Sequence, residues 1–124
     1  MPANDYPKHY DHLRSLMSRL SAQAPATMTA FQQLHSAGVG EGVLDVKTKE
    51  LIALAIAITV RCDGCIAFHV HDALKAGATK DEIVEAIGVA VLMGGGPSVA
   101  YGSEALDAVE QFLASNRPDV HPSH

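Results

Sequence analysis

The sequence predicts an all-α fold of about six helices. Apolar side chains recur at three- and four-residue spacing along most of the chain, which is the period of a helix buried on one face. Glycine and proline stand between these segments, where helices begin and end. No useful length alternates apolar and polar residues as a strand would. With 48 % hydrophobic and 19 % charged residues, the 124-residue chain suits one compact domain with its own core.

The first half of the chain predicts three helices. The first is indicated by one apolar stripe, which consists of Tyr10, Leu13, Leu16, Met17 and Leu20. Pro25 opens a second helix, because its fixed φ suits the first helical position. Three glycines in residues 38–43 then predict a loop. Asp45 is a suitable N-cap for a third helix that ends at about Thr59 and is apolar on every side beyond Glu50.

Two further helices follow with clear end signals. The fourth is expected to begin near residue 62 or 63 and to end at residue 76. Gly77 then stands in the C′ position, which often requires a positive φ. Thr79 and Glu82 fit a capping box, and they open a fifth helix that ends near residue 93.

The last helix and the chain end complete the domain prediction. Residues 94–96 are all glycine and break the pattern, and Pro97 is expected to be the first residue of a sixth helix that reaches about residue 114. Residues 1–115 therefore form the single predicted domain. Residues 116–124, which contain two prolines, are expected to be a disordered tail.

Two of the predicted helices carry more apolar surface than a small domain can cover. Residues 51–60 and 83–93 are rich in Ala, Ile, Leu and Val on several faces. A domain of this size buries only a limited share of its surface. We therefore expect an obligate homo-oligomer, and a monomer with an exposed apolar surface is the alternative.

Charge and composition exclude several classes of protein. The formal net charge is -5 and no basic cluster is present, so nucleic acid is not an expected partner. The longest apolar run, residues 51–60, is well short of the roughly 20 residues that span a bilayer. The polar N-terminal segment lacks the apolar stretch of a secretory signal. We expect a cytoplasmic protein that needs no membrane and no cofactor.

The motif that carries chemistry is Cys62-Asp63-Gly64-Cys65 followed by His69. On a helix, the two cysteines and His69 fall within about 60° of one another. A helix start stabilises a thiolate, and Cys-x-x-Cys is close enough to form a disulfide. The pattern favours a redox dithiol over two idle buried cysteines. A metal ion on both cysteines, His69 and one carboxylate is the remaining alternative.

Glu50 and His71 need separate interpretation. Glu50 precedes Cys62 by twelve residues, and is either an idle acid in the first turn of a helix or a partly buried proton relay for His69 or a cysteine. His71 lies about 180° from Cys62 on the helical wheel, so we expect it to face solvent or a subunit contact. The other histidines show no pairing with the motif and are treated as surface or core residues: His9, His12, His35, His121 and His124.

Glu50, Cys62-x-x-Cys65 and His69 at these spacings resemble the alkyl hydroperoxidase D (AhpD) core of the carboxymuconolactone decarboxylase family. The resemblance extends over about residues 45–112 and includes the triple glycine and the following Tyr101. It implies an AhpD-like helical bundle, which matches the all-α prediction. It also implies assembly as a trimer or a hexamer.

The same resemblance implies a thiol peroxidase, or disulfide oxidoreductase, for organic hydroperoxides. Cys65 would be oxidised to a sulfenic acid, and Cys62 would protonate the leaving alkoxide and then close the disulfide. Glu50 and His69 would form the proton relay. A lipoyl-type dithiol would be the reductant, with a peroxiredoxin as a further partner. Gly64 stands where the best-known peroxidase members carry a histidine, so a water or another side chain must bridge the relay to the thiols.

Two other functions stay open. A small-molecule (lactone) decarboxylase or isomerase would use Glu50 and His69 as acid and base, and would tolerate loss of both cysteines. A non-catalytic redox or metal sensor would show reversible disulfide formation or stoichiometric zinc without turnover.

Overall fold

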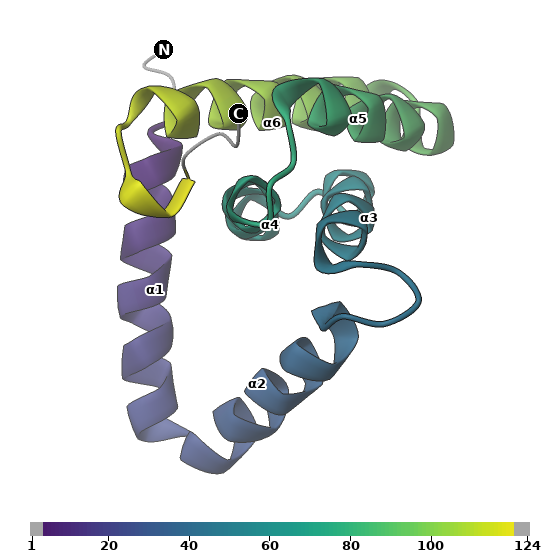
Figure 1. Cartoon of the computed structure of the whole chain (residues 1–124). Coiled ribbons are helices and arrows are strands. Elements are labelled where there is room, and N and C mark those ends of the chain that lie inside the picture. The colour runs from purple at the N-terminus through teal and green to yellow at the C-terminus, as the bar shows by residue number, and fades with distance from the viewer. Residues whose placement is uncertain (1–3, 121–124) are drawn as a thin grey trace.

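The computed structural model describes residues 4–120, and over that range the protein is all-α (Figure 1). In chain order the elements are α1 (Tyr6–Gln23), α2 (Pro25–Val39), α3 (Val46–Thr59), α4 (Asp63–Lys75), α5 (Lys80–Gly94), α6 (Gly96–Ala114) and a short 3-10 helix, η1 (Pro118–Val120). The predicted fold class and the six helices are confirmed. Between residues 4 and 120, no helix is long and apolar enough to cross a membrane.

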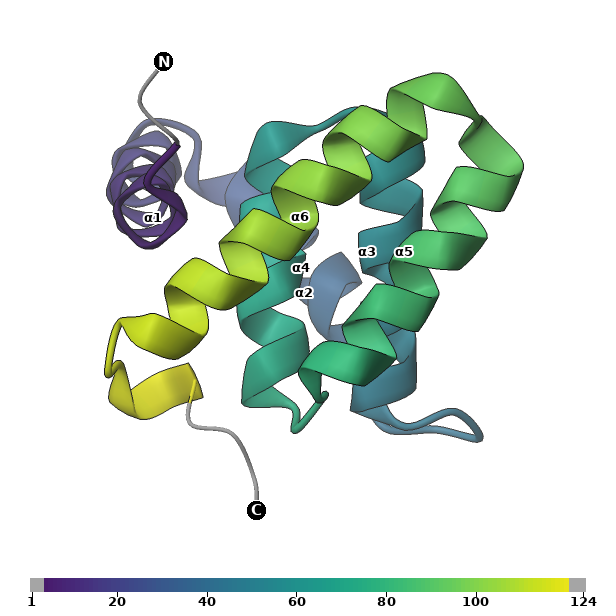
Figure 2. The same cartoon turned by 90° about the horizontal axis from the view of Figure 1, so that it is seen from above.

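The helix α4 is the centre of the structure. α5 and α6 form a layer over α3 and α4, and α6 runs diagonally across that layer (Figures 1 and 2). α1 stands beside α4, so α4 packs against α1, α3, α6 and η1. The buried residues of α4 are Ile66, Ala67, Val70, His71, Ala73 and Leu74. The Cys-x-x-Cys motif is therefore attached to the most enclosed helix.

Local sequence signals set most helix ends as expected. The Asp45 side chain accepts a hydrogen bond from the Thr48 backbone N–H at 2.8 Å and so caps α3. At the start of α5, the Glu82 N–H donates to Thr79 Oγ1 at 3.1 Å, and the Thr79 N–H donates to Glu82 Oε1 at 2.9 Å. This is the predicted capping box. Gly77, just past α4, has the predicted positive φ of 96°.

Two helices extend beyond their predicted limits. α1 begins before its apolar stripe, because the Asp5 side chain caps it by accepting from the Lys8 N–H at 3.1 Å. α2 continues through Gly38, so the expected loop starts later. It ends with Gly40 as C-cap, whose N–H donates to the Ser36 carbonyl at 3.0 Å. A glycine near a helix end costs too little to stop the helix there.

A tight turn brings α5 and α6 together. Gly95 has φ 68° and ψ -146°, a combination that is open essentially only to glycine. Along the contact, a Cβ at Gly102 would lie 2.7 Å from Ile87 Cγ2. The glycine therefore permits the close approach of the two helices.

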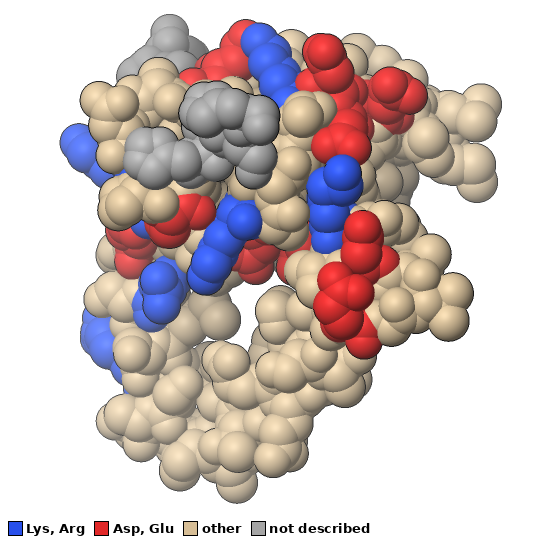
Figure 3. Space-filling model, viewed as in Figure 1, with Lys and Arg blue, Asp and Glu red and all other residues tan. Residues whose placement is uncertain are grey.

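α1 and α2 form an arm that leaves the body of the protein. None of the residues of α2 is buried, and its sequence contains no Lys, Arg, Asp or Glu. Figure 3 shows the α2 end of the molecule as uncharged surface, while Lys and Arg side chains lie along α1, and an opening separates the arm from the helices above it. The arm also exposes large apolar side chains, namely Leu16, Leu20, Phe31 and Leu34.

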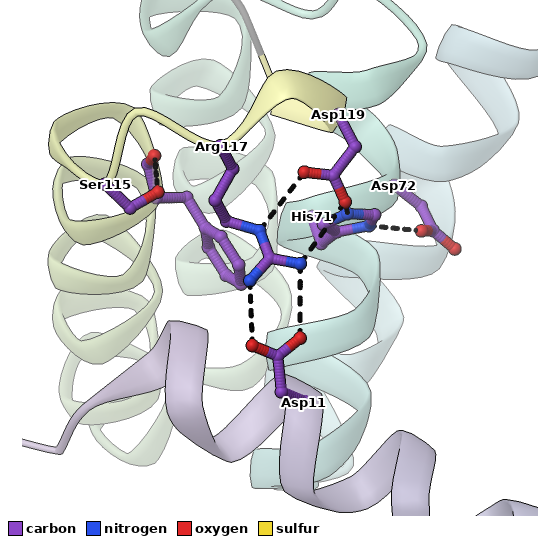
Figure 4. Close-up of polar contacts among 7 residues, drawn as sticks. Asp11, His71, Asp72, Ser115, Arg117 and Asp119 are labelled. Atoms are coloured by element: carbon purple, nitrogen blue, oxygen red, sulfur yellow. Dashed lines mark hydrogen bonds and ion pairs between the residues drawn. The ribbon is translucent and has the colours of Figure 1, made fainter.

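The segment after α6 packs against the core, and the prediction of a disordered tail is wrong for residues 116–120. Val120, in η1, is only 2 % exposed. Arg117 donates to both carboxylate oxygens of Asp11 on α1, at 2.9 and 3.2 Å, and to Asp119 at 3.1 Å (Figure 4). Asp11 is 106 residues away in sequence, so the polar and proline-containing composition of the segment gave no sign of this contact. Residues 121–124 lie outside the described part.

His71 is buried, and its predicted position facing solvent or a subunit contact is wrong. Its Nδ1 lies 2.8 Å from Asp72 Oδ1 and its Nε2 lies 2.6 Å from Asp119 Oδ2 (Figure 4). Its ring also stacks on Tyr10, with centroids 4.0 Å apart. Arg117, and then His71, hold the pKa of the Asp119 carboxyl well below its usual range by hydrogen bonding to its ionised form. α1 and η1 cover this face of α4, which a helical wheel cannot show.

Candidate active site

A short turn after α3 places the cysteines at the start of α4. The turn is a Schellman motif: the Arg61 N–H donates to the Ile58 carbonyl at 3.2 Å, and the Cys62 N–H donates to the Ala57 carbonyl at 3.1 Å. Arg61 occupies the left-handed position with φ 61°, which is uncommon for a residue other than glycine. The end of α3 thus fixes where Cys62 begins the next helix.

Cys62 and Cys65 form a disulfide, with their Cα atoms 5.2 Å apart. Cys62 is the N-cap of α4, and its Sγ accepts a hydrogen bond from the Cys65 backbone N–H at 3.2 Å. Both side chains are partly buried, and Cys65 also packs against the core. In the reduced protein, the free N–H groups and the positive end of the helix dipole stabilise a thiolate at this position.

Glu50 and His69 form an acid–histidine pair between α3 and α4. His69 Nδ1 lies 2.7 Å from Glu50 Oε1. The Glu50 side chain is only 3 % exposed, whereas that of His69 is 21 % exposed. Glu50 lies just past the first turn of α3 and makes this contact, so it is not an idle first-turn acid. An ionised carboxylate only accepts hydrogen bonds, so in a neutral ring Nδ1 carries the proton and Nε2 is free to accept one.

The structure thus brings Glu50 and His69 into contact, and places His69 one helical turn after Cys65 on the same helix. Within residues 4–120, no hydrogen bond joins the His69 ring to a sulfur atom. Gly64 supplies no bridging group either. A Cβ at Gly64 would lie 3.0 Å from Leu13 Cδ1, so a side chain at this position would require Leu13 of α1 to move.

Two residues near Glu50 were not singled out as site residues from the sequence. These are His35 on α2 and Asp72 on α4. One possible metal-ligand atom from each of them and one from Glu50 all lie within 4.8 Å of one another. Nothing in the sequence links these residues, because they stand on three different helices and share no short spacing. Only the return of α2 towards α3 and α4 brings them together.

The fold and the site define an all-α protein with a Cys-x-x-Cys disulfide and a buried acid–histidine pair. The chain belongs to the carboxymuconolactone decarboxylase family, whose sequence profile matches residues 25–108. The family resemblance seen in the motif is confirmed.

Solved structures of this family are similar over most of the chain. A carboxymuconolactone decarboxylase family protein from Legionella pneumophila is 42 % identical, with a TM-score of 0.84 over 86 % of this chain and 96 % of that chain. One from Thermotoga maritima, for which a role in the antioxidative response has been suggested, is 32 % identical. Its TM-score is 0.77 over 88 % of this chain and 94 % of that chain.

Two similar sequences belong to uncharacterised proteins. An uncharacterised protein of Cupriavidus necator is 41 % identical over 87 residues, which make up 70 % of this chain and 77 % of that protein. Uncharacterised protein 4 in the cox locus of Paracoccus denitrificans is 40 % identical over 83 residues, 67 % of this chain and 75 % of that protein.

Proposed function

We propose that this protein is a thiol-dependent peroxidase, or disulfide oxidoreductase, that reduces organic hydroperoxides through Cys65 and Cys62. The observation that carries the proposal is the Glu50–His69 pair, one helical turn from a disulfide-forming pair at a helix start. The antioxidative role suggested for the Thermotoga maritima relative supports the same chemistry.

The proposed reaction begins at Cys65. His69 Nε2 takes the Cys65 thiol proton through a bridging water, since Gly64 offers no side chain for the transfer. The thiolate attacks the terminal hydroperoxide oxygen, so that an S–O bond forms and the O–O bond breaks. The Cys62 thiol gives its proton to the leaving alkoxide, which departs as an alcohol. The Cys62 thiolate then attacks the sulfenic sulfur, and the released hydroxide takes the proton from His69 to leave as water.

The resulting disulfide needs a two-electron reductant. A lipoyl-type dithiol would attack one sulfur, form a mixed disulfide and then close its own ring, which returns both cysteines to thiols. In this proposal a peroxiredoxin is a further partner of the reduced Cys62 and Cys65 pair. In this proposal Glu50 is a positioning residue, because it holds the His69 ring and fixes which nitrogen carries the proton.

The protein is also proposed to act as a homo-oligomer, a trimer or a hexamer. The two helices that are rich in apolar residues, α3 and α5, expose large apolar side chains on the single chain. These are Ile52, Ile56, Val84, Val89, Leu92 and Met93. The uncharged helix α2 (Figure 3) and the exposed Leu16 and Leu20 of α1 add to this surface. Burial of such surface favours association. Light scattering at micromolar concentration should find an oligomer, and a monomer would contradict the proposal.

A single-turnover thiol titration tests the reaction. The protein is fully reduced, freed of reductant, kept in EDTA, and mixed with one equivalent of cumene hydroperoxide. We expect rapid loss of two thiols per chain and no disulfide in Cys65→Ser. In Cys62→Ser, Cys65 should accumulate as a sulfenic acid that dimedone traps. Full peroxide turnover in Cys65→Ser would refute the assignment.

The contribution of the acid–histidine pair is measured in the same assay. Glu50→Gln should slow thiol oxidation at least tenfold, while far-UV circular dichroism confirms the native helix content. Glu85→Gln changes an exposed acid on α5 and is the matched control. An unchanged rate in Glu50→Gln would remove Glu50 from the mechanism. Thiols that do not react with the hydroperoxide would contradict the peroxidase proposal. They would favour acid–base chemistry by Glu50 and His69, or a sensor without turnover.

A further inference from the structure

We propose a second site in this protein, a divalent transition-metal site formed by His35, Glu50 and Asp72, with Zn²⁺ as the ion that suits it. The three residues come from α2, α3 and α4, and one ligand atom of each lies within 4.8 Å of the others. One imidazole nitrogen and two carboxylate oxygens are ligands that zinc accepts. Three protein ligands would leave a fourth position for water.

Within the described residues, each carboxylate of this group has one oxygen in a hydrogen bond and the other open. Glu50 Oε1 bonds to His69 at 2.7 Å, and Asp72 Oδ1 bonds to His71 at 2.8 Å. Over residues 4–120, the second oxygen of each carboxylate accepts no hydrogen bond, and the His35 ring makes none. The histidines that hold the other oxygens would act as outer partners, which orient ligating groups in metal sites.

Charge and burial also favour a cation here. The side chain of Glu50 is 3 % exposed and that of Asp72 is 25 % exposed. Two carboxylates this close repel each other, more strongly where water is largely excluded, and a cation between them relieves the repulsion. His35 and Asp72 are partly exposed, so an ion can reach the buried oxygen from solvent.

The geometry needs only a small closure. Ligand atoms in a tetrahedral zinc site with bonds of about 2.0–2.1 Å lie roughly 3.3 Å apart. The observed separations of up to 4.8 Å therefore have to shorten. His35 is on the arm helix α2, which buries none of its residues, so its rotamer and its helix can adjust without disturbing the core.

This site is distinct from the dithiol and does not depend on the proposed peroxidase activity. It uses no sulfur ligand; Glu50 is the one ligand that it takes from the proposed relay, and His69 would only orient that ligand. Zinc binding is therefore expected in the oxidised protein, where Cys62 and Cys65 are tied in a disulfide and provide no thiolate.

Isothermal titration of the oxidised, tag-free, metal-free protein with ZnCl₂ tests the proposal. We expect one zinc ion per chain with micromolar or tighter affinity. His35→Ala and Asp72→Asn should each weaken binding at least tenfold. His12→Ala removes an exposed histidine of α1 from outside the group, and it should bind zinc as the unchanged protein does.

Amide hydrogen exchange gives a second readout that surface binding would not produce. Zinc ties α2 to α3 and α4, so exchange across α2 should slow in the unchanged protein but not in His35→Ala. No binding by the oxidised protein would overturn the proposal, and so would binding that both variants retain, which would be an adventitious ion only. Loss of two thiols in the hydroperoxide assay without zinc binding would support the peroxidase proposal and overturn the metal site. Zinc binding by a protein whose thiols do not react would support the metal site and contradict the peroxidase proposal.

Discussion

Deletion of residues 117–124 should destabilise the protein, although their composition predicts an idle tail. The deletion removes Val120 and exposes the pocket that it fills. Burial of this side chain contributes about 1.5–3 kcal/mol to the free energy of unfolding. It also removes Asp119 from His71, and an unsatisfied buried polar group costs about 1–3 kcal/mol. The half-exposed ion pair of Arg117 with Asp11 adds little. We expect a loss of about 3–5 kcal/mol, which is a large part of the stability of a small domain.

Urea denaturation followed by circular dichroism measures this loss, provided that the oligomeric state is the same for both proteins. Val120→Ala and Asp119→Asn separate the apolar contribution from the polar one. Glu110→Gln is the control, because it breaks an ion pair with Lys80 whose side chains are 53 % and 45 % exposed, and it should cost at most about 1 kcal/mol. If the deletion lowers the free energy of unfolding by less than about 0.5 kcal/mol, the reasoning is refuted and the segment does not stabilise the fold.

Two further predictions concern close packing and pH. Gly102→Ala should lower the free energy of unfolding by about 1–3 kcal/mol, because the new Cβ would lie 2.7 Å from Ile87 Cγ2. Gly88→Ala on α5 meets nothing within 4 Å and should instead be neutral or stabilising by up to about 1 kcal/mol. Equal effects in urea denaturation would contradict the packing argument. Because Arg117 and His71 lower the pKa of Asp119 in the folded protein, its stabilisation is complete above the ordinary carboxyl pKa near pH 4 and is lost as the pH falls towards the lowered value. Asp119→Asn should therefore cost more stability at pH 7 than at pH 2.5, and an equal cost at both would refute the assignment.

Most helix boundaries and the place of the cysteines were predictable because they depend on neighbours in the chain. A cap needs a side chain within about three residues of the N–H it serves, as Asp45 and Thr79 show. The positive φ of Gly77 follows from its place after a helix. Cys62 at a helix start belongs to the same class of local signal.

The acid–histidine pair was only partly predictable. Spacing placed His69 beside the cysteines, because all three are on one helix. For Glu50 the sequence left two interpretations open, and the choice depended on whether α3 would pack against the His69 face of α4. The contact at 2.7 Å shows that Glu50 pairs with His69, and its part in proton transfer belongs to the proposed function.

Tertiary packing alone decided the rest. The burial of His71 and the docking of Val120 depend on α1 and η1 meeting one side of α4, and no helical wheel contains those partners. His35 reaches Glu50 and Asp72 for the same reason, since the return of α2 sets that distance. The sequence by itself determined the helices and the reactive motif, whose interactions span a few residues. The structure determined which side chains meet across helices, because those contacts depend on loop paths and on the sum of many weak packing preferences.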